Sequence, residues 1–216
     1  MSDARVLAEL VATGVIAVLR APAPEAALAT VDALVAGGVT GIEITYSIPD
    51  AAAVIAECRR RHGRTILLGA GTVTTAAQAE QAVQAGASYL VSPGTTRPLA
   101  EAMRATGAAV MLGALTPTEL MTAVELGATV VKIFPASLGG PAYLKALRGP
   151  FPDTAVMPTG GVTAANLATW LAAGAVAVGA GGDLCPPAAI AAGDFTRIQS
   201  LAAEFADALH AARAAA

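Results

Sequence analysis

The stretch "VELGATVVKIF", residues 124–134, contains the pattern that decides the fold. It is typical of a helix end, followed by a glycine suited to the first position beyond a helix, followed by a short apolar β segment. The same pattern recurs in "VAGGVTGIEIT" (35–45), "VQAGASYLVSP" (83–93) and "LAAGAVAVGAG" (171–181). Each copy is half of a βα unit, so the repeats predict an alternating β/α architecture.

Eight strands are expected, near residues 15–20, 40–46, 65–70, 88–92, 108–112, 128–134, 154–159 and 175–180. Helices fill the gaps, with an extra helix near 3–13 and a last one near 195–212. This alternation predicts a (β/α)8 TIM barrel with an extra N-terminal helix. An open doubly wound sheet is the rival, and eight regular units without a separate second half favour closure. No linker interrupts the series, so one domain over 1–216 is expected.

Start signals support the helical segments between the strands. Asp50 precedes "AAAVIAECRRR", and Thr163 precedes "AANLATWLAAG". Thr116, Pro117 and Glu119 match the N-cap, first and third positions of a capping box. These signals predict where three of the helices begin.

Composition excludes several classes of protein. Hydrophobic residues make up 55% of the chain and charged residues 13%, which suits a large core. A net charge of −3 without a stripe of basic residues argues against nucleic-acid binding. The apolar residues are spread over short segments such as "WLAAGAVAVGAGG" (170–182), which is broken by glycine, so no membrane span is expected.

The N-terminal "MSDARVLAELVATG" lacks the basic region of a secretory signal, which predicts a cytoplasmic protein. Cys58 and Cys185 show no metal-ligand spacing and fit free thiols in a reducing compartment. The one basic cluster, "CRRRHGR" (58–64), has two interpretations. A solvated helix C-terminus that complements the helix dipole is favoured, and an anion site is the alternative.

Lys132 is conspicuous because every neighbour in "VVKIF" is apolar, and because the chain has only one other lysine, Lys145, against eleven arginines. A hydrated ammonium is costly to bury without a partner. Strand side chains alternate, so Val131 and Ile133 are expected on one face and Lys132 on the other, facing the barrel interior.

Glu43 in "GIEIT" is expected to face the same interior, with Ile42 and Ile44 packing outward against helices. Glu43 and Lys132 belong to the second and sixth expected strands, and alternate strands share layers inside a barrel. One interpretation is a structural ion pair. The other is catalytic: apolar surroundings favour the uncharged amine, a nucleophile toward ketones, and Glu43 transfers protons as a general acid and base.

Polar groups also follow other strands. Thr72 offers a hydroxyl in the Gly-rich turn "LLGAGTVT", and Arg20 closes the strand "VIAVLR", where a guanidinium suits a carboxylate. An ordinary βα turn and a surface arginine are the alternatives.

The loops "PTGGVT" (158–163) and "VGAGGDL" (178–184) follow the seventh and eighth strands, where this fold commonly binds phosphate through backbone amides. Plain tight turns are the alternative.

Seven motifs in order give the chain a specific resemblance: "AGGVTGIEITY", "GAGTV", "VSPGTT", "TPTEL", "VKIFPAS", "LKALRGPFP" and "PTGGVT". Together they resemble the 2-keto-3-deoxy-6-phosphogluconate (KDPG) aldolase family. These class I aldolases include enzymes for 4-hydroxy-2-oxoglutarate (also called KHG) and for 2-keto-3-deoxy-6-phosphogalactonate. The resemblance runs from "GVIAVLR" to "AAGDFTRI" and implies a cytosolic homotrimer that binds a small-molecule 2-keto acid and needs no metal or cofactor.

The resemblance also implies residue roles. Lys132 matches the Schiff-base lysine, Glu43 the proton-transferring glutamate, and Thr72 the threonine that contacts the pyruvyl part. Phe134 matches the aromatic residue beside the imine, and Thr159 a residue linked to aldehyde-face selectivity.

The glycines Gly160 and Gly161 match the phosphate loop of the family, and Gly181 and Gly182 lie in the second expected phosphate loop. Gly182 replaces a frequent phosphate-binding serine, which removes one hydroxyl donor.

Two further departures concern other positions. Ser47 stands where gluconate-type enzymes often carry an arginine for the substrate carboxylate, and Arg20 matches the arginine of galactonate-type members that could substitute. Leu112 replaces a frequent proline, with no consequence assigned.

The expected reaction is cleavage of 2-keto-3-deoxy-6-phospho sugar acids to pyruvate and glyceraldehyde 3-phosphate, extending to 4-hydroxy-2-oxoglutarate, which gives pyruvate and glyoxylate. The alternatives are a non-covalent phosphosugar isomerase or synthase, with Glu43 as base and Lys132 as its electrostatic partner, and a non-catalytic metabolite-binding barrel. The sequence leaves open the gluconate or galactonate epimer and whether phosphate is obligatory.

Overall fold

The computed structural model describes residues 3–215, in which eight parallel strands alternate with helices. The strands are β1 (Val15–Leu19), β2 (Gly41–Thr45), β3 (Leu67–Gly71), β4 (Tyr89–Val91), β5 (Ala109–Ala114), β6 (Val130–Ile133), β7 (Val156–Pro158) and β8 (Val178–Ala180). Each predicted strand is present close to its expected position, so the predicted alternation is confirmed.

The sheet closes into a barrel. Its strand order is β7-β6-β5-β4-β3-β2-β1-β8, and a parallel bridge between Thr159 and Gly179 joins the two ends. A Cβ on Gly179 would lie 2.3 Å from Oγ1 of Thr159, so the close approach at the seam requires glycine. The structure is therefore a (β/α)8 TIM barrel, and the open doubly wound sheet is excluded.

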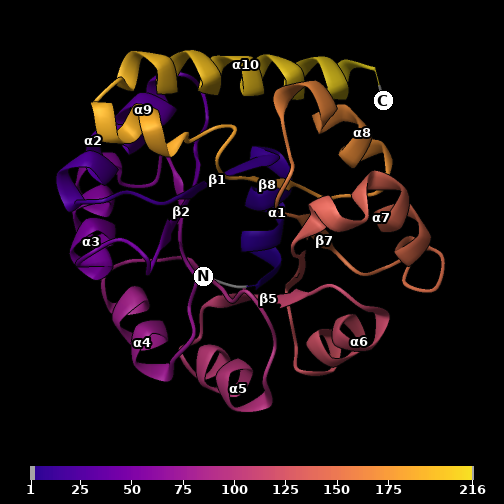
Figure 1. Cartoon of the computed structure of the whole chain (residues 1–216). Helices are drawn as coiled ribbons and strands as arrows, with labels where there is room; N and C mark the ends of the chain where they lie inside the picture. The colour runs from indigo at the N-terminus through magenta and orange to yellow at the C-terminus, as the bar shows by residue number, and fades with distance from the viewer. Residues whose placement is uncertain (1–2, 216) are drawn as a thin grey trace.

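A ring of helices surrounds the barrel (Figure 1). The helices are α1 (Asp3–Thr13), α2 (Pro24–Ala36), α3 (Ala51–His62), α4 (Ala76–Gln84), α5 (Arg97–Ala105), α6 (Pro117–Glu125), α7 (Gly140–Arg148), α8 (Leu167–Ala172), α9 (Pro187–Ala192) and α10 (Phe195–Ala214). The extra first helix and the long last helix were expected, whereas the short α9 was not. Within residues 3–215, no helix is long and apolar enough to cross a bilayer.

The helix starts follow the predicted signals in different ways. At α6, Oγ1 of Thr116 accepts from the Glu119 amide at 3.3 Å, and Oε2 of Glu119 accepts from the Thr116 amide at 2.8 Å, which confirms the capping box. Thr163 caps the 3₁₀ turn η2 (Ala164–Asn166), directly before α8. Asp50 precedes α3 as expected but adopts a left-handed φ of 51° and makes no capping hydrogen bond.

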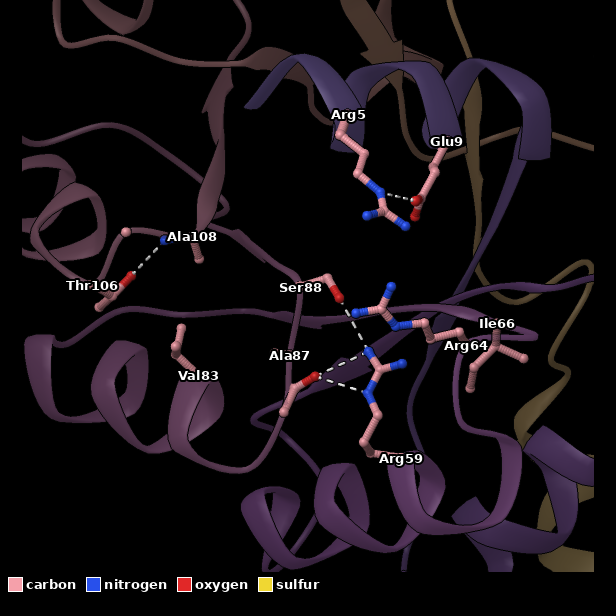
Figure 2. Close-up of a pocket in the computed structure, with 12 residues that line it drawn as sticks. Arg5, Glu9, Arg59, Arg64, Ile66, Val83, Ala87, Ser88, Thr106 and Ala108 are labelled. Carbon is pink, nitrogen blue, oxygen red and sulfur yellow. Dashed lines mark hydrogen bonds and ion pairs between the residues drawn. The ribbon is translucent and has the colours of Figure 1, made fainter. Parts of the chain in front are cut away.

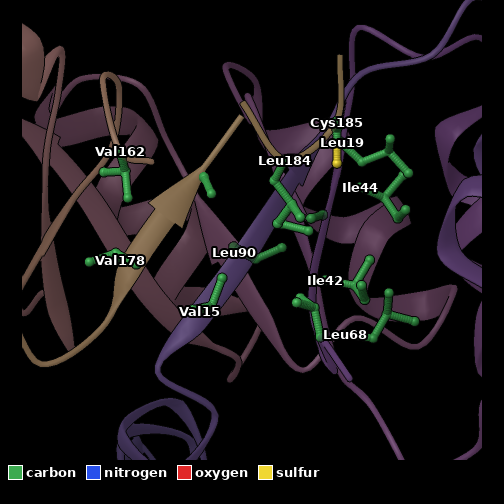
Figure 3. Packing of buried hydrophobic residues seen from close by; sticks show 14 of the residues in the cluster. Val15, Leu19, Ile42, Ile44, Leu68, Leu90, Val162, Val178, Leu184 and Cys185 are labelled. Atoms are coloured by element: carbon green, nitrogen blue, oxygen red, sulfur yellow. The ribbon is translucent and has the colours of Figure 1, made fainter. Parts of the chain in front are cut away.

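The buried apolar side chains form two clusters, one on each face of the sheet. Ile42 and Ile44 of β2 and Val131 and Ile133 of β6 belong to the cluster between the sheet and the helices, as predicted. Figure 3 shows part of this cluster around β1, β2 and β8.

A second cluster fills the barrel itself. Val6 and Leu10 of α1 are fully buried in it together with residues from the starts of the strands, such as Leu67 and Ala109. Helix α1 therefore closes the amino-terminal end of the barrel, inside the ring of Figure 1.

Candidate active site

A cavity of about 160 Å³ lies at the carboxyl ends of the strands. We call it the mouth cavity, and its lining is Val18, Arg20, Thr72, Pro93, Lys132, Phe134, Thr159, Gly160, Gly161, Gly181, Gly182 and Asp183. Nine of the ten residues singled out from the sequence are in this lining. The tenth, Glu43, lies beneath it and contacts Lys132.

Lys132 and Glu43 form a buried pair near the barrel axis. Lys132 on β6 is 5% exposed and Glu43 on β2 is 0% exposed. Nζ of Lys132 donates to Oε1 of Glu43 at 3.5 Å, and it lies 5.5 Å from the centroid of the Phe134 ring. Oε2 of Glu43 is buried and has no hydrogen-bond partner within residues 3–215. The carboxylate can therefore exchange a proton with the amine while its second oxygen remains available to a ligand or a water.

A glycine creates the space for this carboxylate. A Cβ on Gly71, at the end of β3, would lie only 1.8 Å from Oε1 of Glu43. On the other side, Oη of Tyr89 donates to the carbonyl of Ile42 at 2.9 Å. Burial, and secondarily the charge of Glu43, hold the pKa of Tyr89 well above its ordinary value, so this phenol stays protonated. Neighbouring strands thus fix the position of Glu43.

Two threonines present hydroxyls to the mouth cavity. Thr72 follows β3 and has a φ of 54°, a left-handed conformation that is unfavourable for a β-branched side chain. Such strain persists where the surrounding structure imposes it, and it clusters at binding sites. Thr159 follows β7, and its Oγ1 is buried without a partner among the described residues. Both hydroxyls are placed to bind a ligand.

Arg20 supplies the second cation of the mouth cavity. It follows β1 directly and is exposed, and only Arg20 and Lys132 are basic among the lining residues. Ser47 is not in the lining, and its Oγ lies 2.7 Å from Oγ1 of Thr45. Arg20 is therefore the one guanidinium among the lining residues, and its role toward a carboxylate stays a prediction.

The glycine loops after β7 and β8 also line the mouth cavity. Within residues 3–215, the amides of Gly161, Gly181 and Gly182 donate no hydrogen bond, so they are free to bind an anion. A Cβ at Gly181 or Gly182 would meet no atom within 4 Å, which leaves open space beside these amides. Three unbonded amides beside open space suit the binding of a phosphate group.

Three lining residues were not predicted: Val18, Pro93 and Asp183. Val18 could have been found, because it shares the register of Glu43 across β1 and β2. Asp183 follows Gly182 in a loop already singled out, but the direction of a loop side chain does not follow from a sequence period. Asp183 adds a negatively charged residue to the lining that includes the glycine loops.

The donor set does not resemble a metal centre. Among residues 3–215, no group of three or more His, Cys, Asp or Glu side chains is arranged to hold a metal ion. Cys58 and Cys185 are buried free thiols. Burial raises the pKa of both thiols to about 12, so neither is a nucleophile at neutral pH.

Two curated relatives are similar to this chain over most of its length. The 2-dehydro-3-deoxy-phosphogluconate aldolase of Treponema pallidum is 40% identical over 170 residues, covering 78% of this chain and 80% of the relative. The 2-dehydro-3-deoxy-6-phosphogalactonate aldolase of Escherichia coli is 39% identical over 170 residues, covering 78% and 83%.

A solved structure is similar over almost the whole fold. The KDPG aldolase of Legionella pneumophila, with pyruvate captured as a covalent carbinolamine intermediate, superposes with a TM-score of 0.84 at 33% identity and covers 94% of this chain and 97% of that one. The family model for aldolases described as "KDPG and KHG aldolase" matches residues 6–201. The chain therefore belongs to the KDPG and KHG aldolase family.

Proposed function

We propose that the protein is a class I aldolase that cleaves 2-keto-3-deoxy-6-phospho sugar acids to pyruvate and glyceraldehyde 3-phosphate. The observation that carries this proposal is the buried amine of Lys132, which lines the mouth cavity 3.5 Å from a carboxylate oxygen of Glu43. A lysine amine held in an apolar barrel beside a proton acceptor is suited to Schiff-base formation with a ketone. Family membership supports the same chemistry.

The reaction begins at the substrate's C2 ketone. The Lys132 amine, after passing its proton to Glu43, attacks C2 and forms a carbinolamine. Loss of water, with the proton supplied by Glu43, leaves a protonated imine. This cationic imine is the electron sink for the bond-breaking step, so the chemistry requires no metal or cofactor.

Cleavage follows at the C3–C4 bond. Glu43, directly or through a water, takes the proton of the C4 hydroxyl, the C3–C4 bond breaks, and the aldehyde departs while the electron pair forms an enamine. Protonation of the enamine at C3 and addition of water to the imine then release pyruvate and the free Lys132 amine. Glu43 Oε2, buried without a partner in residues 3–215, is the oxygen available for these transfers.

The mouth cavity suggests how the rest of the substrate is bound. Arg20 and Thr72 are assigned to the pyruvyl carboxylate, since a guanidinium and a hydroxyl both donate to it. Phe134 is assigned to the imine, because its ring centroid lies 5.5 Å from Nζ of Lys132. Thr159 is assigned to the aldehyde part, because its unpartnered hydroxyl lies next to the glycine loops.

The phosphate is assigned to the loop amides of Gly160, Gly161, Gly181 and Gly182. Without a serine at position 182 these amides are expected to favour phosphorylated substrates without making phosphate obligatory. We expect cleavage of both the gluconate and the galactonate 6-phosphates, since the relatives named for them match the chain almost equally well.

The test is steady-state kinetics with pyruvate release as the readout. We expect kcat/KM to be higher for KDPG and its galacto epimer than for 4-hydroxy-2-oxoglutarate. A preference for 4-hydroxy-2-oxoglutarate would overturn the phosphate assignment and leave the lysine chemistry intact. No pyruvate release from any of the three would overturn the aldolase proposal and favour a non-covalent isomerase or synthase, in which Lys132 is only an electrostatic partner.

The assembly we propose is a cytoplasmic homotrimer. Large apolar side chains are exposed on one side of the ring: Met121 (60%) and Val124 (47%) on α6, and Leu138 (73%) in the 3₁₀ turn η1 (Ala136–Leu138). Apolar surface of this kind is often covered by another subunit. Sedimentation velocity should give the mass of three chains, and a monomer at micromolar concentration would contradict the proposal.

A further inference from the structure

A second, larger cavity of about 420 Å³ lies at the opposite end of the barrel (Figure 2). It opens between α1 and the segments that lead into β3, β4 and β5, and the side chains of Arg5, Arg59 and Arg64 project into it. We call it the amino-end cleft. The mouth cavity shares no lining residue with it, and no step of the aldol cleavage uses it.

Arg59 is held rigidly at the floor of the amino-end cleft. Its Nε and Nη2 donate to the carbonyl of Gly86 at 3.1 and 3.0 Å, Nη2 also donates to Oγ of Ser88 at 3.0 Å, and Nη1 donates to the carbonyl of Gly63. All of these acceptors are uncharged. The guanidinium is therefore oriented precisely, keeps one N–H unused, and has no carboxylate bonded to it.

Arg64 adds a second positive charge beside the first. In Figure 2 its guanidinium lies next to that of Arg59, close to Ser88. Arg64 makes no side-chain hydrogen bond or ion pair in the part of the chain that the structure describes. Partial burial, and after it the charge of Arg64, lower the pKa of Arg59 below its ordinary value. An arginine nevertheless remains charged at neutral pH, so the two guanidiniums repel each other, and the charge of Glu9 partly opposes this effect on Arg59.

Among residues 3–215, one carboxylate lines the amino-end cleft. Glu9 on α1 accepts from Nε of Arg5 at 2.9 Å, so it is already paired with the third arginine. Elsewhere on the same surface the balance is different. Arg60 and Arg61, from the same basic cluster, bond Glu57 at 2.7 and 2.8 Å. Within the basic cluster 58–64, the arginines without a bonded carboxylate are thus the two that line the cleft, Arg59 and Arg64.

We propose that the amino-end cleft is a binding site for a small anion that carries a phosphate group. Three guanidiniums, one from α1 and two from the basic cluster 58–64, reach one volume, an arrangement that suits the several acceptor oxygens of a phosphate group. The hydroxyl of Ser88, whose oxygen accepts from Arg59, can donate a further hydrogen bond to the anion. The volume suits a metabolite-sized ligand, and no aromatic side chain lines the cleft to stack on a nucleotide base.

The test is isothermal titration calorimetry with inorganic pyrophosphate in metal-free buffer at low salt. The key variant is Arg64→Ala, because Arg64 holds no structural contact among the described residues and its loss should leave the fold intact by circular dichroism. The matched control is Arg60→Ala, which removes the same charge from the end of α3 but outside the cleft. Arg20→Ala reports on binding at the mouth cavity.

We expect saturable binding to the wild-type protein, at least a tenfold loss of affinity in Arg64→Ala, and less than a twofold change in Arg60→Ala and Arg20→Ala. Absence of saturable binding to the wild type would overturn the proposal. Equal losses in Arg64→Ala and Arg60→Ala would show a diffuse charge effect. A loss that follows Arg20→Ala alone would place the anion at the mouth cavity, and either result would also overturn the proposal.

Discussion

Lys132 and Glu43 show how a single charged residue in an apolar strand can indicate a functional site. Each is flanked by residues that pack outward, so the strand period alone directs both side chains into the barrel. The pair is 3.5 Å apart, and one carboxylate oxygen has no partner among residues 3–215. A purely structural ion pair would be expected to use both oxygens, because an unsatisfied buried acceptor costs about 1–3 kcal/mol. The unused oxygen therefore favours a role with a ligand.

Replacing Glu43 by glutamine should remove proton transfer while preserving shape. We expect Glu43→Gln to lower kcat by roughly 10²–10⁴, as is common when a general acid or base is lost. KM should change less, because Glu43 does not line the mouth cavity. Steady-state kinetics on KDPG measures both constants. A rise in KM with kcat unchanged would assign Glu43 to binding instead.

Gly71 provides a second test of where this carboxylate must sit. In Gly71→Ala the new methyl group would lie 1.8 Å from Oε1 of Glu43, so the carboxylate has to leave the position in which it contacts Lys132. A displacement on the order of 1 Å commonly costs about 10² in rate. We expect that loss in kcat, against little change in the control Gly94→Ala, where the methyl group meets no atom within 4 Å. Normal turnover by a folded Gly71→Ala protein would contradict the proposed position of Glu43.

The secondary-structure elements could be predicted where the alternation of apolar residues or a helix-capping motif determines them. All eight strands and the capping box at Thr116 follow from local chemistry, because alternation and N-cap hydrogen bonds act over a few residues. The short α9 was not predicted, since its six residues carry too little periodicity. Loop side chains were also missed, because the path of a loop depends on the elements at its ends. Asp183 is the clearest example.

The loop after β8 should influence the preference for phosphate through Asp183. Its carboxylate lines the mouth cavity beside the glycine amides, where it repels a phosphate dianion. Asp183→Asn should raise the ratio of kcat/KM for KDPG over 4-hydroxy-2-oxoglutarate by about three- to tenfold, as expected for one charge a few ångströms away in a wet site. The control Asp153→Asn removes an exposed carboxylate that does not line the cavity. Equal ratios in both variants would place Asp183 away from the phosphate.

The two ends of the barrel differ in structure. Helix α1 closes the amino-terminal end, and its arginine also reaches the amino-end cleft, while the carboxyl end is left to the mouth cavity. The basic cluster "CRRRHGR" shows what the sequence could not decide. Arg60 and Arg61 are solvated ion-paired residues, as the favoured interpretation held, whereas Arg59 and Arg64 line a cavity. The difference depends on tertiary neighbours that lie far away in the sequence.

Closure by α1 should contribute strongly to stability. Leu10 is fully buried in the cluster inside the barrel, so Leu10→Ala should leave a cavity and lower the free energy of unfolding by about 2–5 kcal/mol. The neighbouring Val11 is 44% exposed, and Val11→Ala should have a much smaller effect. Urea denaturation followed by circular dichroism measures both. Similar small losses in the two variants would mean that α1 does not seal the barrel.

The covalent role of Lys132 is the central claim, and its most direct test is reductive trapping. The protein is incubated with pyruvate and sodium borohydride, digested, and mapped by mass spectrometry. We expect a reduced pyruvyl adduct on Lys132, no adduct in Lys132→Ala, and none in Lys132→Arg, because a guanidinium is not a nucleophile at neutral pH. Lys145 near the end of α7 is exposed and serves as the internal control. A label on Lys145 instead, or an unlabelled protein that still cleaves KDPG, would contradict the account.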